Sequence, residues 1–338
     1  MIASRAILSK QTLNVLTRQP ACFVHQGDYG NWGNTNIAVV FSGCGWWDGT
    51  DVHEAVYTMY HLSRNGARFQ MFAPNQQQMN VIDHMKKQPA SGENRNVMVE
   101  AARFSHGQGQ MQMQDLSKLD ASSFDAIIFP GGHGITKNLS SFVKDGKDCK
   151  LHSDVDRVLK EFHRNRKPIG LSSMAPMLAC KALPGIEVTM GYEKDESSRW
   201  GNWPHTSMVQ AVKGMGAKHA VREPYISFEP PNSPKETLKS ESEPESKCPL
   251  DRPHVCNRAV ACLVGGRGSV GTGGGTRPMA SHRVAGYRPD LHHEAYVDEK
   301  NKVISTPSFM WETEYHYHYI FDGIGNMVKH VLRMSTPQ

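Results

Sequence analysis

The sequence predicts an α/β protein with a mostly parallel β-sheet covered by helices on both faces. Short continuous apolar runs are typical of strands that are buried on both faces of a parallel sheet. Segments with helical spacing of apolar residues alternate with these runs, as in repeated β-α units. One apolar run also turns into a proline-started helix at Ser172 and Ser173. That is where many α/β enzymes present a nucleophile.

The elements follow in order along the chain. Residues 37–41, with the sequence IAVVF, form the first predicted strand. A helix follows over residues 52–62, with Asp51 as its N-cap and Gly66 just past its end. Apolar runs and helical spacing predict the remaining elements in the same way. They are strands at 69–73, 126–129, 168–171 and 303–305, and helices at 154–163, 175–180 and around 324–331.

Two segments are predicted to lie outside the folded domain. Residues 1–35 have the composition of a mitochondrial transit peptide, because the first 27 residues contain Arg and Lys but no acidic residue. A frayed basic terminus is the alternative. Residues 226–293 contain eight Pro and eight Gly, which predicts a disordered insertion unless the segment is an artefact of sequence assembly. A single domain over 36–225 and 294–334 remains.

Charge and cysteine usage exclude several classes of function. The net charge of +5 arises partly from the leader and the insertion, and no basic patch interleaved with aromatic residues appears, so we expect no nucleic-acid partner. Seven cysteines without CxxC spacing argue against a zinc module or a secreted disulfide framework. No apolar run approaches the roughly 20 residues of a membrane span. We therefore expect a soluble mature protein without metal or cofactor.

Several short motifs together are characteristic of a known superfamily. They are SGCG at 42–45 with DGT at 48–50, FPGG at 129–132, KNLS at 137–140, DGKDCK at 145–150, KPIGL at 167–171, DEKNKV at 298–303 and DGIG at 322–325. The chain resembles the class I glutamine amidotransferase-like superfamily, near the bacterial ElbB glyoxalase-like proteins and the PfpI branch. The resemblance covers nearly everything except the leader and the insertion.

This resemblance implies a flavodoxin-like three-layer α/β/α sandwich with a nucleophile elbow, and a homodimer. In the superfamily the elbow residue is usually a cysteine that faces an acid from the first helix. Carried over by motif, the elbow position is Ser173 and the acid is Glu54, with backbone N–H groups near Gly131, Gly132 and Met174 as oxyanion donors. A hydroxyl is far too weak an acid to be held ionised as a thiol is, so the serine removes the usual chemistry.

Each of these residues also has a purely structural interpretation. Glu54 lies three residues after Asp51, as in a capping box. Ser173 could cap the helix that begins near Pro176. Gly131 and Gly132 could form only a tight turn after a strand, although two glycines there suit the close approach of an anion.

Two further motifs carry less weight. His316 and His318 lie late in the chain, where glutaminases of the superfamily place a catalytic histidine, but their His-Pro-Glu pattern is missing. We therefore do not expect glutamine hydrolysis, and without a third ligand nearby we do not expect a metal there. The glycine pattern at 266–271 fits a dinucleotide fingerprint, but a fingerprint must open a helix, and the residues after it are TGGGTRP.

The sequence thus favours a mitochondrial protein, located in the matrix, that is non-catalytic and binds a small metabolite or a protein partner. The alternative is a glyoxalase-like or deglycase-like lyase or hydrolase that uses Ser173 with Glu54, and His316 or His318. A third hypothesis is a structural protein with a vestigial pocket. The presence of a base within hydrogen-bond reach of Ser173 Oγ separates the first two hypotheses.

Overall fold

The structure is a computed structural model that describes residues 32–105, 112–198, 201–221, 295–313 and 315–336. The predicted leader, apart from its last four residues, lies outside the described residues, and so do the predicted insertion and the glycine pattern within it. The domain boundaries drawn from these segments therefore remain predictions.

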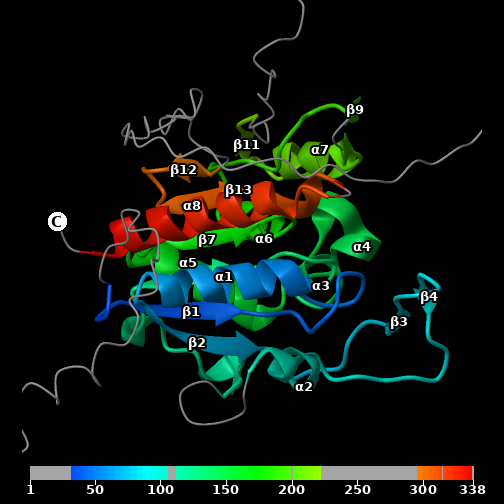
Figure 1. Cartoon of the computed structure of the whole chain (residues 1–338), viewed down its shortest axis with the longest axis horizontal. Coiled ribbons are helices and arrows are strands. Elements are labelled where there is room, and N and C mark those ends of the chain that lie inside the picture. Colours follow the sequence, from blue (N-terminus) through cyan, green and yellow to red (C-terminus); the bar gives the residue numbers. More distant parts are fainter. Residues whose placement is uncertain (1–31, 106–111, 199–200, 222–294, 314, 337–338) are drawn as a thin grey trace, which may run out of the picture. The chain divides into compact units, whose positions relative to one another are not determined.

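A seven-stranded sheet forms the centre of the domain (Figure 1). Six of its strands run parallel, and only β12 pairs antiparallel, with β13. In spatial order the strands are β12 (Tyr296–Asp298), β13 (Val303–Thr306), β7 (Ile169–Ser172), β6 (Ala126–Phe129), β1 (Asn36–Val40), β2 (Arg68–Ala73) and β5 (Gln114–Asp115).

The central strands are apolar because helices cover both of their faces. Every residue of β6 and β7, and every residue of β1 from Ile37 to Val40, is buried. Apolar side chains on both faces of a strand bury most surface when helices pack above and below the sheet. The strands predicted at 37–41, 69–73, 126–129, 168–171 and 303–305 are confirmed to within a residue or two at their ends.

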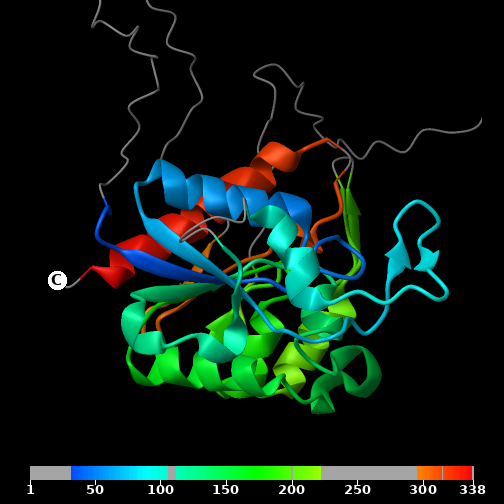
Figure 2. The same ribbon diagram turned by 90° about the horizontal axis from the view of Figure 1, so that it is seen from below.

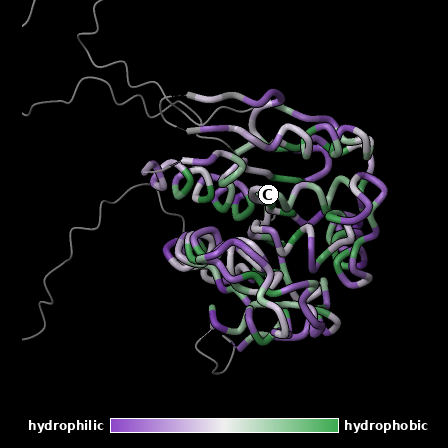
Figure 3. Tube along the Cα trace, turned by 90° about the vertical axis from the view of Figure 1, so that its right-hand side faces the viewer, coloured by the Kyte–Doolittle hydropathy of each residue, from purple (hydrophilic) through white to green (hydrophobic). Residues whose placement is uncertain are grey.

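Two pairs of helices provide this cover (Figure 2). The helices α1 (Val52–Arg64) and α8 (Tyr317–Ser335) lie on one face, and α5 (Ser153–Arg164) and α6 (Pro176–Ala182) lie on the other. The side chains at 155, 158, 159 and 162 of α5 are buried, as their helical spacing predicts. Figure 3 shows hydrophobic and hydrophilic residues alternating around the helical turns. The predicted mostly parallel three-layer α/β/α architecture is confirmed.

Short elements that have no clear sequence period complete the domain. The strands are β3 (Ile82–Asp83), β4 (Gln88–Pro89), β8 (Glu187–Val188), β9 (Glu196–Ser198), β10 (Gly201–Trp203) and β11 (Lys218–His219). The helices are α2 (Val97–Ala101), α3 (Gly134–Lys137), α4 (Phe142–Asp145) and α7 (Thr206–Gly214). Short 3₁₀ turns are η1 (Ala102–Phe104), η3 (Leu116–Lys118), η4 (Ala121–Ser123), η5 (Gly146–Asp148) and η6 (Ser308–Met310). Within the described ranges, no helix combines the length and apolarity needed to span a bilayer.

The parallel strands bring four loops to one edge of the sheet. The loops that follow β1, β6, β7 and β13 all leave from carboxyl ends, and these strands are neighbours in the sheet. Ligand sites in open α/β sheets lie at this edge. The candidate site is built from these loops and from the first turn of α1.

Candidate functional site

A tight turn after β7 places Ser173 in an uncommon backbone conformation. Its φ angle is 55°, in the left-handed region that non-glycine residues seldom adopt. The backbone N–H of Ser173 donates to Thr306 O at 3.0 Å, which ties the turn to the end of β13. The helix α6 then begins at Pro176, and its N-cap Ala175 provides no side-chain hydrogen bond. Ser173 therefore does not cap this helix, and its side chain is fully buried.

Glu54, in the first turn of α1, reaches across to the turn after β7. Its backbone N–H is capped by Asp51 Oδ1 at 2.9 Å. Its carboxyl does not return to the cap, as it would in a capping box. Instead, Glu54 Oε2 accepts hydrogen bonds from Ser172 Oγ at 2.5 Å and from the backbone N–H of Gly131 at 2.6 Å. The structure thus brings Glu54, Gly131 and Ser172 into one buried cluster.

The burial of Glu54 changes its acidity. Desolvation and, to a lesser extent, the nearby charge of Asp51 raise the pKa of its carboxyl to about 8, against hydrogen bonds that favour the charged form. The carboxyl is therefore mostly protonated at neutral pH. Because Oε2 already accepts two hydrogen bonds, the proton resides on Oε1. Oε1 is buried and has no hydrogen-bond partner among the described residues.

The two glycines after β6 are required by close packing. A Cβ atom at Gly131 would lie 2.5 Å from Ser173 Cβ and 2.7 Å from Glu54 Oε2. Gly132 has a φ of 106°, and a Cβ atom there would lie 2.4 Å from the backbone nitrogen of Asp51. These glycines therefore do more than form a tight turn. Because they lack a Cβ atom, the backbone and side chains of neighbouring segments can pack directly against them.

Only part of the expected oxyanion donor set has free N–H groups. The N–H of Gly131 is engaged by Glu54 and also lies 3.2 Å from Ser172 Oγ. The N–H groups of Gly132 and Met174 form no hydrogen bond with any residue that the structure describes. These two groups have no partner within the described part of the chain, whereas the N–H of Gly131 holds the carboxyl of Glu54 in place.

No hydrogen bond joins the hydroxyl of Ser173 to a base within the described residues. Its Oγ is buried and has no hydrogen-bond partner in the described part of the chain. The hydroxyl of Ser173 lies close enough to Glu54 to act against the rise in the pKa of that carboxyl. Its position relative to the carboxyl does not have the geometry of a hydrogen bond. His316 contacts Thr313 Oγ1 at 3.2 Å, and His318 is exposed, with its ring centre 4.1 Å from that of Tyr319. Neither histidine forms a hydrogen bond with the hydroxyl of Ser173.

Three polar side chains that the sequence did not single out are buried at the end of β13 and in the turn after it. Thr306 pairs in register with Ser172, and the 3₁₀ turn η6 follows it. Thr306 Oγ1, Ser308 Oγ and Trp311 Nε1 are buried and, among the described residues, have no hydrogen-bond partner. Ser308 has a φ of 44°, again in the left-handed region. The only sequence signal was polar residues directly after an apolar strand.

Aromatic rings from three loops meet at the same edge. Trp46 lies with its ring centre 5.7 Å from that of His133 and 5.5 Å from that of Phe309. Trp47 stacks on His133 at 5.0 Å. Burial lowers the pKa of His133 to about 4, so this imidazole is neutral at physiological pH. The site thus combines buried hydroxyl and N–H donors with a neutral aromatic cluster.

A parallel three-layer sandwich with a strand-turn-helix turn at the carboxyl edge of its sheet is a fold found in amidotransferase-like proteins. The fold is shared with a solved isoprenoid biosynthesis protein with an amidotransferase-like domain from Ehrlichia chaffeensis. The TM-score is 0.59 at 21% identity, covering 89% of this chain and 100% of that chain. That likeness concerns the fold alone. No protein-family model matches the chain.

Relatives define the family more narrowly. The chain is 63% identical over 337 residues to the "ES1 protein, mitochondrial" of Danio rerio, covering 99% of this chain and 100% of the relative. It is 42% identical over 299 residues to the human "Glutamine amidotransferase-like class 1 domain-containing protein 3, mitochondrial", covering 88% of this chain and 83% of the relative. The chain therefore belongs to the mitochondrial ES1 family of glutamine amidotransferase-like proteins. The predicted superfamily and mitochondrial location are confirmed, while the matrix and the homodimer stay predictions.

Proposed function

We propose that this protein binds a small polar metabolite at the elbow and does not turn it over. The observation that supports this is the environment of Ser173 Oγ, which no hydrogen bond from a described residue reaches. A serine becomes a nucleophile only when an adjacent base accepts its proton. Here Ser173 acts as a hydrogen-bond donor to the ligand, and the replacement of a thiol by a hydroxyl removes covalent chemistry.

A small metabolite fits the site better than a protein partner does. Ser173, Ser172 and Glu54 are 0% exposed, so a macromolecular surface cannot reach them. A small ligand enters through local opening of the loops that carry the aromatic rings. Inside, the two free N–H groups and the hydroxyls of Ser173 and Ser308 donate hydrogen bonds. Buried donors without partners cost about 1–3 kcal/mol each, which a ligand with oxygen acceptors recovers.

The ligand is therefore a small oxygen-rich molecule, such as a carbonyl or carboxylate compound. Its uncharged part contacts Trp46 and Phe309, and its oxygens face Ser173 and the N–H groups of Gly132 and Met174. The neutral Glu54 donates through Oε1. We place this function in the mitochondrial matrix, on the basis of the basic and acid-free composition of the first 27 residues.

A metabolite screen tests the proposal. The mature protein and its Ser173→Ala variant are incubated with a library of small carbonyl and carboxylate metabolites, and melting temperatures are measured. We expect hits that raise the melting temperature of the parent more than that of the variant. Each hit is then incubated with the protein and quantified by mass spectrometry, and we expect it to be recovered unchanged. Loss of a hit that depends on Ser173 would contradict the non-catalytic assignment.

One observation favours the alternative enzyme function. A carboxyl with a pKa of about 8 is well suited to proton transfer near neutral pH. A glyoxalase-like reaction that uses Glu54 as the acid or base would need Ser173 only to orient the substrate. Consumption of methylglyoxal that is abolished in Glu54→Gln but retained in Ser173→Ala would support this alternative over simple binding.

A further inference from the structure

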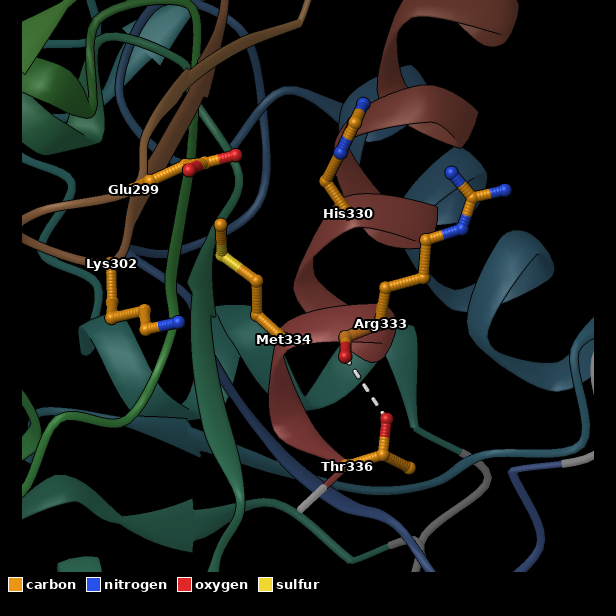
Figure 4. A pocket seen from close by; sticks show the side chains of 6 residues that line it. All are labelled: Glu299, Lys302, His330, Arg333, Met334 and Thr336. Carbon is orange, nitrogen blue, oxygen red and sulfur yellow. Dashed lines mark hydrogen bonds between the residues drawn. The ribbon is translucent and has the colours of Figure 1, made fainter. Parts of the chain in front are cut away.

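A second cluster of polar side chains lies at the opposite edge of the sheet from the elbow. The turn between β12 and β13 and the last turns of α8 border an open hollow of about 560 Å³, a volume within the range of ligand pockets. Figure 4 shows the side chains that line it, with two on the turn and the others on or just after α8. They are Glu299, Lys302, His330, Arg333, Met334 and Thr336. Lys302 directly precedes β13, so the hollow lies at the amino end of that strand.

The turn that presents Glu299 and Lys302 is held rigidly. Asp298 is buried, and its carboxylate accepts hydrogen bonds from the backbone N–H of Asn301 at 3.0 Å and from Asn301 Nδ2 at 2.7 Å. Lys302 has a φ of 59°, and its carbonyl accepts a hydrogen bond from Ile169 N at 2.9 Å. This segment is the DEKNKV motif, which the elbow does not use. The backbone of this turn therefore fixes the position from which the Lys302 side chain extends.

The hollow is predominantly basic. Lys302 lines it from the turn, and His330 and Arg333 line it from α8, on the other side of Met334 (Figure 4). Neither Lys302 nor Arg333 forms an ion pair with any residue that the structure describes, unlike Arg95, Arg103 and Arg157. Glu299 is the one carboxylate among the six lining residues, and it is exposed. Two cations without an ion pair among the described residues, an imidazole and a single acid therefore line this space.

The carboxyl end of α8 repels an anion less strongly than a helix end whose carbonyl groups have no hydrogen-bond donors. Exposed carbonyls of a last helical turn carry partial negative charge. Here the carbonyl of Val331 accepts from Ser335 Oγ at 2.7 Å, and the carbonyl of Arg333 accepts from Thr336 Oγ1 at 3.0 Å (Figure 4). These hydroxyls already satisfy two of the terminal carbonyls.

We propose that Lys302, His330 and Arg333 bind the phosphate group of a small phosphorylated metabolite. A phosphate offers three oxygens and about two negative charges, which match an ammonium, a guanidinium and an imidazole better than a monocarboxylate does. Met334 provides an apolar contact for the organic part. Glu299 accepts a hydrogen bond from a hydroxyl of the ligand. This site is separate from the elbow and does not depend on the function proposed there.

Calorimetric titration with inorganic pyrophosphate and with AMP tests the site. The parent protein is compared with a double variant, Lys302→Ala with Arg333→Ala, and with a matched control, Lys86→Ala with Lys144→Ala. The control removes the same two charges from exposed positions after the carboxyl ends of β2 and β6. We expect the Kd of both probes to rise about tenfold or more in the first variant and to change less than about twofold in the control.

Three results would overturn the proposal. They are the absence of binding of either probe to the parent at millimolar concentration, equal weakening in both double variants, and binding of adenosine as tight as that of AMP. If the first double variant does not fold, Arg333→Lys retains the charge but loses the planar donor fork. Binding to that variant should then be weaker than binding to the parent, and unchanged binding would also contradict the assignment.

Discussion

The hydroxyl of Ser172 donates a 2.5 Å hydrogen bond to Glu54 Oε2, although the two residues are 118 positions apart in the sequence. The bond joins the end of β7 to the first turn of α1, and Gly131 N–H reinforces it from the end of β6. The residue before the elbow therefore holds the buried acid, while Ser173 itself has no hydrogen-bond partner among the described residues. Adjacent serines thus have different environments, since one holds the buried acid and the other has an unpartnered hydroxyl within the described part of the chain.

The stability of the parent protein relative to Glu54→Gln should fall as pH rises. Burial raises the folded-state pKa of Glu54 to about 8, above its unfolded value near 4.3. Between these values the folded state binds one proton more than the unfolded state, so unfolding becomes easier with increasing pH, by up to about 1.4 kcal/mol per unit. Urea unfolding of both proteins at pH 5, 6.5 and 8 measures the difference. Glu299→Gln, at an exposed carboxyl, controls for the loss of a charge. A pH-independent difference between the parent and Glu54→Gln would show that Glu54 is ionised throughout.

Glycine should be tolerated at Ser173 but not at Ser172. Ser173 already occupies the left-handed region, which costs a non-glycine residue about 1–2 kcal/mol in steric strain. Glycine has no such strain, and this gain offsets the larger entropy that glycine loses on folding. Ser172 lies in a strand and holds Glu54. We expect Ser173→Gly to stay within about 1 kcal/mol of the parent and Ser172→Gly to lose about 2–4 kcal/mol. Denaturant unfolding of the two variants gives the comparison, and equal losses would argue against the geometry of the turn.

Gly131→Ala should be far more damaging than Gly185→Ala. The added Cβ at 131 would meet the Ser172 carbonyl oxygen at 2.9 Å as well as Glu54 and Ser173, so backbone must move. At Gly185 the φ angle is 86°, but no described atom lies within 4 Å of the position that an added methyl group would take. We expect a loss of about 3 kcal/mol or more for the first variant and about 1–2 kcal/mol for the second. Melting temperatures provide the test, and a mild effect at 131 would indicate a looser contact.

Ser173→Cys should create a thiol with a lowered pKa. The free N–H groups of Gly132 and Met174 and the proton on Glu54 Oε1 can all donate to a thiolate, although burial acts in the opposite direction. The ultraviolet absorbance of the thiolate, taken as a difference from the parent across a pH titration, measures this pKa. Because the elbow is buried, alkylation by iodoacetamide should be limited by local opening. A thiol that titrates at or above the ordinary value of about 8.5 would mean that these donors do not face position 173.

Local patterns in the sequence predicted the framework of the fold. The strands β1, β6 and β7 are continuous apolar runs, and α5 places its apolar residues at helical spacing. Each pattern reports burial of a short segment against its neighbours, so it can be recognised without knowledge of the rest of the chain. The glycines at 131 and 132 and the turn before Pro176 were likewise visible as exceptions to regular structure.

The composition of the two candidate sites depended on tertiary structure. The pairing of Thr306 with Ser172 follows from the register of β13 against β7, and this register brings Thr306 to the elbow across more than one hundred residues. Lys302 and Arg333 share a hollow only because α8 packs across the sheet and ends near the turn before β13. The sequence by itself determined which segments are strands, helices and turns, since those depend on neighbouring residues. Strand register and helix packing decided which polar groups meet, because these contacts join distant segments that no local pattern relates.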